Sequence, residues 1–66
     1  MNIHEYIEGT VYNAGDLVWY KDTNGTTYLL RCIKQNNSQV PDTSGIPKNS
    51  YSKSGEERLN ASGWEN

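Results

Sequence analysis

The clearest hydrophobic pattern in the chain is a pair of short runs separated by polar residues. Apolar, aromatic and β-branched residues dominate 17–21 and 26–34, and Asp22-Thr23-Asn24-Gly25 lies between them. Asn-Gly between two such runs is a strong signal for a β-hairpin, whose tight turn matches the twist of its strands. We therefore expect two antiparallel strands joined by a two-residue turn at Asn24-Gly25.

Large apolar side chains occupy both faces of this expected hairpin, because side chains alternate along a strand. One face is expected to form the core, from Val18, Tyr20, Tyr28, Leu30 and Cys32, joined by Trp64. The other face carries Leu17, Trp19, Leu29, Arg31 and Ile33. A chain of 66 residues has little material to cover both faces. Two alternatives remain open: Ile7, Tyr12 or the 40–51 segment covers the second face, or Trp19 stays exposed to contact a ligand or partner.

The rest of the chain has weaker patterning. Residues 1–9 form a leader, whose apolar and aromatic residues are expected to form a helical turn or to pack loosely on a module spanning 10–66. Asn13-Ala14-Gly15-Asp16 has turn composition, because Asn and Gly tolerate positive φ and Asp hydrogen-bonds nearby backbone. A long polar segment with turn chemistry follows residue 34.

A short helix is predicted near the C-terminus. Ser54-Gly55-Glu56-Glu57 matches a capping box, with Ser54 as the N-cap. A helix near 54–60 is too short to be stable alone, so Leu59 and Trp64 must dock it on the hairpin. The predicted fold is therefore small and all-β: a compact antiparallel sheet around a hairpin at 17–33, a long irregular loop and this helical turn.

Composition narrows the classes of function. The net charge of −2 argues against a nucleic-acid partner, which would favour a basic patch. No window of about 18 apolar residues is present to span a membrane. The N-terminus lacks the basic and apolar regions of a signal peptide, which predicts export without such a signal or an origin as a module of a larger protein. The single Cys32 falls in phase with the core face, so we expect a buried apolar residue and not a reactive thiol.

Catalytic and metal chemistry find little support in the sequence. His4 is the only histidine and lies in the leader. Glu56-Glu57 are neighbours in sequence, which does not place two carboxylates on opposite sides of a glycosidic bond, and acids at a helix start explain them. No His/Cys cluster has metal-ligand spacing. We therefore expect no enzyme activity and no cofactor.

A family resemblance is carried by an ordered set of turn, strand and aromatic residues. They are Tyr12-Asn13-Ala14-Gly15-Asp16-Leu17-Val18-Trp19-Tyr20, Gly25-Thr26-Thr27-Tyr28, Cys32, Pro41 and Trp64-Glu65. This pattern resembles the carbohydrate-binding modules of families five and twelve, which accompany secreted glycoside hydrolases that act on chitin and cellulose. A related version occurs in bacteriophage tail and fibre proteins. The adjacent pair of aromatics typical of the chitinase modules is absent from 31–35, which favours the phage-type version.

The resemblance implies a non-catalytic glycan-binding module, located on a virion or outside the cell. A phage tail or head fibre recognising host polysaccharide is the preferred setting, with a module of a secreted chitin- or cellulose-degrading enzyme as an alternative. Sugar rings stack on aromatic planes and their hydroxyls bond to polar side chains. The candidate stacking residues are Trp19 and Tyr51, and the candidate hydrogen-bonding residues are Arg31, Asn36, Asn37 and Gln39. A second hypothesis makes the Trp19 side a packing surface in a homotrimer or against another virion protein.

Overall fold

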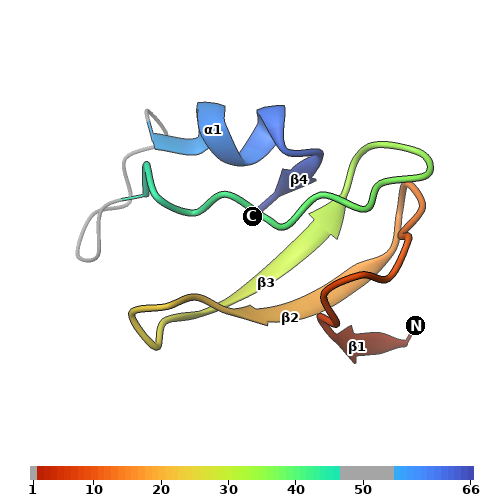
Figure 1. The fold of residues 1–66 in the computed structure, drawn as a ribbon, viewed down its shortest axis with the longest axis horizontal. Helices are drawn as coiled ribbons and strands as arrows, with labels where there is room; N and C mark the ends of the chain where they lie inside the picture. The colour runs from red at the N-terminus through yellow and green to blue at the C-terminus, as the bar shows by residue number, and fades with distance from the viewer. Residues whose placement is uncertain (1, 47–54) are drawn as a thin grey trace.

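The computed structural model describes residues 2–46 and 55–66, which form one four-stranded sheet and one short helix (Figure 1). The strands lie in the order β1-β2-β3-β4. The elements are β1 (Ile3–Glu5), β2 (Leu17–Lys21), β3 (Thr27–Cys32), α1 (Glu56–Ala61) and β4 (Trp64–Glu65). The predicted small all-β fold is confirmed.

Strands β2 and β3 form the predicted hairpin, but its turn is one residue longer than expected. Asp22 N donates to Thr26 O at 2.9 Å and Gly25 N donates to Asp22 O at 3.0 Å, which leaves a loop of residues 23–25. Gly25 has φ of +86°, whereas a two-residue Asn-Gly turn would need positive φ at both positions. The Asp22 carboxylate stabilises the longer loop, because its Oδ1 accepts the backbone N–H groups of Asn24 and Thr26.

The leader forms a strand and not a helical turn. Strand β1 pairs in parallel with β2, with Ile3 opposite Leu17, so the sheet is mixed and not purely antiparallel. Tyr6 explains this path. Its backbone N–H donates to Trp19 O at 2.8 Å, and its ring stacks on Tyr12 with centroids 5.6 Å apart. The same ring lies edge-on to Tyr20 and Trp64 at 5.3 and 5.8 Å.

The core lies between the sheet and the C-terminal part of the chain. Its buried apolar residues are Tyr12, Val18, Leu30, Cys32, Leu59 and Trp64. Burial is confirmed for four residues of the predicted core face, Cys32 among them. Tyr20 and Tyr28 are only half-buried. These two are cross-strand partners near the hairpin turn, whereas β4 pairs with β3 at the opposite end, so their rings are left partly uncovered.

The C-terminal segment closes the core as the sequence predicts, but its helix has a different N-cap from the one expected. Helix α1 has Gly55 as its N-cap and no side-chain cap hydrogen bond, and Ser54 lies outside the described residues. Gly63, with φ of +89°, turns the chain from α1 into β4, which pairs with β3 through Trp64 and Cys32. In the described part of the chain, no helix has the length and apolar character needed to cross a membrane.

Candidate functional site

In the part of the chain that the structure describes, the sheet surface opposite the core is open. Strand alternation and register give this surface, here called the Trp19 face, the residues Ile3, Glu5, Leu17, Trp19, Lys21, Thr27, Leu29, Arg31, Ile33 and Glu65. Trp19 is 44% exposed, and the aliphatic residues Ile3, Leu29 and Ile33 are 38–41% exposed. The alternation read from the sequence thus places Trp19, Leu29 and Ile33 correctly, whereas Ile3 joins the face only through the β1–β2 pairing.

Two of the segments expected to cover this face, Tyr12 and the described part of 40–51, lie elsewhere. Tyr12 is in the core, where it contacts Trp64 at a centroid distance of 5.3 Å. Asp42 N donates to Ser62 Oγ at 3.1 Å, which holds the described part of the 40–51 segment beside the C-terminal layer. Figure 1 shows α1 and the segment after β3 on the same side of the hairpin. Within the described residues, an exposed Trp19 is therefore the alternative observed, and residues 47–51 lie outside them.

Charged groups surround the apolar centre of the Trp19 face. In the sheet register Trp19 lies between Glu5 of β1 and Leu29 of β3. At the β3–β4 edge, Arg31 and Glu65 are cross-strand partners joined by a side-chain ion pair. The face thus offers an aromatic ring, aliphatic neighbours, and carboxylate and guanidinium groups. This combination suits stacking and hydrogen bonding to a neutral ligand, or packing against a protein surface with a polar rim.

The structure brings two of the six sequence-predicted ligand residues onto this face. Trp19 and Arg31 share it. Asn36 is exposed in the loop after β3, where its positive φ of 56° and its N–H bond to Asn13 Oδ1 shape the chain reversal. Gln39 lies on the core side, because its backbone oxygen accepts the Trp64 indole N–H at 3.0 Å. Tyr51 lies outside the described residues.

Asn37 occupies an interior position and not a surface one. It is 1% exposed, and its Nδ2 donates to the carbonyl oxygens of Ser62 and Gly63, both at 3.1 Å. Its Oδ1 accepts the Gln39 N–H at 3.0 Å. Each polar atom of this amide is therefore engaged within the protein. The side chain joins the loop after β3 to the C-terminal segment and does not face the Trp19 side.

Sequence reasoning missed Glu5 and Glu65 as members of the Trp19 face. Glu5 reaches it only because β1 joins the sheet, and a three-residue exposed strand leaves no alternating hydrophobic pattern. Glu65 belongs to the two-residue strand β4. The available signal was the position of Glu65 directly after the buried Trp64, since a neighbour of a core residue in a strand points to the opposite face.

In the described part of the chain, the cysteine and the glutamate pair considered as reactive groups make contacts that support the fold. The Cys32 thiol is buried and donates to Lys34 O at 3.1 Å. Glu56 and Glu57 occupy the first turn of α1, where acids interact favourably with the helix dipole. Over residues 2–46 and 55–66, no cluster of three or more His, Cys, Asp or Glu residues is arranged to hold a metal ion.

Comparisons with family models, with curated proteins and with solved structures each found no match to this chain. The chemistry of the surfaces described above is therefore what bears on function.

Proposed function

We propose that this chain is a non-catalytic glycan-binding module of a bacteriophage virion appendage that recognises host surface polysaccharide. The observation that carries the proposal is the exposure of Trp19 on an open sheet face in a chain whose other tryptophan is fully buried. An indole is costly to leave in water, and its flat apolar plane matches the C–H face of a pyranose ring. The setting on a virion rests on the sequence resemblance alone.

Polar groups beside Trp19 support this reading. Glu5 is its direct neighbour across β1–β2, and Arg31 lies on the adjacent strand of the same face. A carboxylate accepts hydrogen bonds from sugar hydroxyls, and a guanidinium donates to them. Together they supply the directional contacts that a stacking platform lacks.

The first test replaces Trp19 with Ala. Loss of the indole should weaken retention on the recognised polysaccharide about tenfold or more, since burying a large apolar side chain contributes roughly 1.5–3 kcal/mol. Affinity electrophoresis through gels containing capsular polysaccharide, cell-wall glycan, chitin or cellulose measures this. Val40→Ala is the matched control, because Val40 is similarly exposed and lies outside the Trp19 face. Equal retention of Trp19→Ala and the parent protein on the bound glycan would discard the proposal.

An assembly surface is the second candidate, and the aliphatic residues around Trp19 favour it. Ile3, Leu29 and Ile33 contribute exposed apolar area that a single sugar ring does not need. A homotrimer or a neighbouring virion protein would bury all of it.

The two candidates differ in their response to Leu29→Ser. This change should shift the sedimentation profile from trimer toward monomer if the face is an assembly surface, since it places a polar group in an apolar interface. For glycan binding it should leave the chain monomeric and retention nearly unchanged, because the Trp19 ring remains. A parent protein that sediments as a monomer at all concentrations would eliminate the homotrimer.

A further inference from the structure

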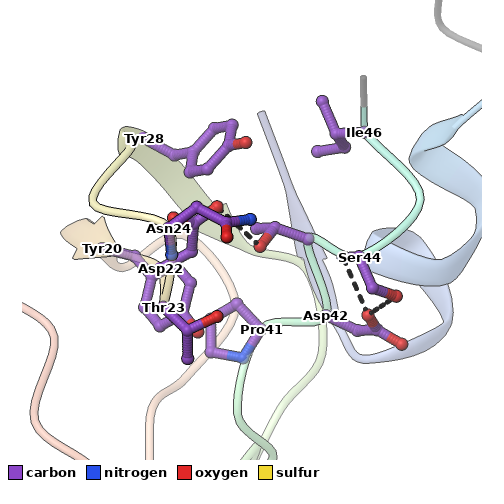
Figure 2. Close-up of a pocket in the computed structure, with 10 residues that line it drawn as sticks. Tyr20, Asp22, Thr23, Asn24, Tyr28, Pro41, Asp42, Ser44 and Ile46 are labelled. Carbon is purple, nitrogen blue, oxygen red and sulfur yellow. Dashed lines mark hydrogen bonds between the residues drawn. The ribbon is translucent and has the colours of Figure 1, made fainter. Parts of the chain in front are cut away.

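A cavity of about 330 Å³ lies on the side of the sheet away from Trp19, between the hairpin turn and the 41–46 segment. Figure 2 shows its residues, with Tyr20, Tyr28 and Asn24 on the hairpin wall and Asp42, Ser44 and Ile46 on the opposite wall. Its volume falls at the lower end of the roughly 300–1,000 Å³ typical of small-ligand sites. None of the functions above uses it.

Both walls of the cavity are held in place by hydrogen bonds. Thr43 Oγ1 donates to Asp22 Oδ2 at 3.4 Å, which ties the 41–46 segment to the hairpin turn. Ser44 donates from its backbone N–H and its hydroxyl to Asp42 Oδ1, at 3.0 and 2.5 Å. The cavity therefore exists before a ligand arrives, which lowers the entropic cost of binding.

The lining combines aromatic walls with an excess of acceptors. The Tyr20 and Tyr28 rings are only half-buried, and Ile46 adds an aliphatic surface opposite them. Among the described residues that line the cavity, none is Lys, Arg or His. Hydrogen bonds from Ser44, then the positive charge of Arg58, lower the pKa of Asp42, so this carboxyl stays ionised. Burial, followed by the charge of Asp22, raises the pKa of Tyr20 and Tyr28, so both phenols stay neutral.

We propose that this cavity binds one pyranose ring of a glycan, as a second subsite on the face opposite Trp19. The inference rests on the proposed glycan-binding function and extends it to a site of a different kind. Several hydroxyl donors on a compact ring match the acceptors of Asp42, Asn24 and the neighbouring hydroxyls. The apolar C–H face of the ring matches the tyrosine rings and Ile46. A fibre module with sites on two faces would bind separate glycan chains, which raises avidity without new contacts.

The test is a titration of the full chain followed by two-dimensional amide NMR. The probes are the methyl glycosides of glucose, galactose, mannose, rhamnose and N-acetylglucosamine, with tetramethylammonium as a cation probe. One of the glycosides should shift the side-chain amide of Asn24 and the backbone amides of residues 22–25 and 42–45. Those shifts should persist in the Trp19→Ala protein, because the two sites are on opposite faces.

Two variants locate the interaction. Asn24→Ala removes an exposed side-chain amide and should weaken the binding that the backbone amide resonances report by about three- to tenfold, as expected for one lost hydrogen bond. Tyr28→Leu keeps apolar bulk and removes one aromatic wall, and it should weaken binding at least as much. Asn60→Ala is the matched control, since Asn60 is exposed on α1 outside the cavity.

The possible outcomes separate this inference from the proposed function. Polysaccharide binding that depends on Trp19, with no glycoside shifting the cavity resonances, overturns the cavity site and leaves the proposed function standing. Glycoside-induced shifts of the cavity resonances, without any Trp19-dependent retention on polysaccharide, support the cavity site and overturn the proposed role of Trp19. A response to tetramethylammonium but to no glycoside overturns the sugar assignment, because it identifies an organic-cation site formed by aromatic rings and carboxylates.

Discussion

At the scale of single residues, Asn37 determines how the two ends of the chain meet. Its backbone exchanges a pair of hydrogen bonds with Tyr12, both 2.7 Å, and its amide spans to Ser62 and Gly63. A side chain at position 63 would overlap the Asn37 amide, so glycine is required there for space as well as for positive φ. One buried residue thus joins three segments that are distant in sequence.

Replacing Asn37 with Ala should lower the free energy of unfolding by roughly 2–4 kcal/mol, because it orphans the Gln39 N–H and the Ser62 carbonyl in a buried site. Urea unfolding followed by tryptophan fluorescence measures the change. Asn37→Asp should be similarly destabilising, since a carboxylate cannot donate to two carbonyl oxygens. Asn60→Ala, the same change at an exposed position, should stay within about 0.5 kcal/mol of the parent. A stable Asn37→Ala protein would contradict the central role of this amide.

The sequence alone does not distinguish Asn37 from its polar neighbours. Residues 35–39 have uniform polar composition, which favours a solvated loop. Their separation into an interior Asn37 and an exposed Asn36 depends on a β-bridge with Tyr12, a contact between residues 25 positions apart. Long-range pairing of this kind leaves no local pattern, so the sequence alone could not place Asn36, Asn37 and Gln39.

At the scale of elements, predictability follows the strength of the local pattern. The hairpin, both of its faces and the short helix could be predicted, because alternation, Asn-Gly chemistry and acids at a helix start act over a few residues. Strand β1 could not be predicted, since all three of its residues are exposed. It exists because Tyr6, just beyond it, packs among three other aromatic rings. The position of Trp19 on the second face was therefore predictable, whereas that of Glu5, carried by β1, was not.

At the scale of the whole molecule, one sheet separates two surfaces of different chemistry. The Trp19 face has exposed aromatic and aliphatic residues edged by charge. The opposite side holds the core at one end and, near the hairpin turn, a cavity with tyrosine walls. Tyrosine suits both the core and the cavity in a chain without phenylalanine. Its ring packs as an apolar group, and its hydroxyl is a polar group suited to the border between core and solvent.

The same tyrosines predict how the stability of the molecule depends on pH. Burial, with smaller contributions from nearby charges such as Glu8 and Asp22, raises the pKa of Tyr6, Tyr20 and Tyr28 above 10.0. The folded state therefore retains these phenolic protons at a pH where the unfolded chain loses them. The stabilisation is fully present below pH about 10 and is lost as pH rises through the folded-state pKa values.

Urea midpoints measured from pH about 8 to about 11 should fall across this window. Tyr28→Phe removes one titrating group and should make the fall shallower, while lysine titration is common to both proteins and cancels in the comparison. A midpoint that falls equally in both proteins would show that Tyr28 ionises alike in the folded and unfolded chain.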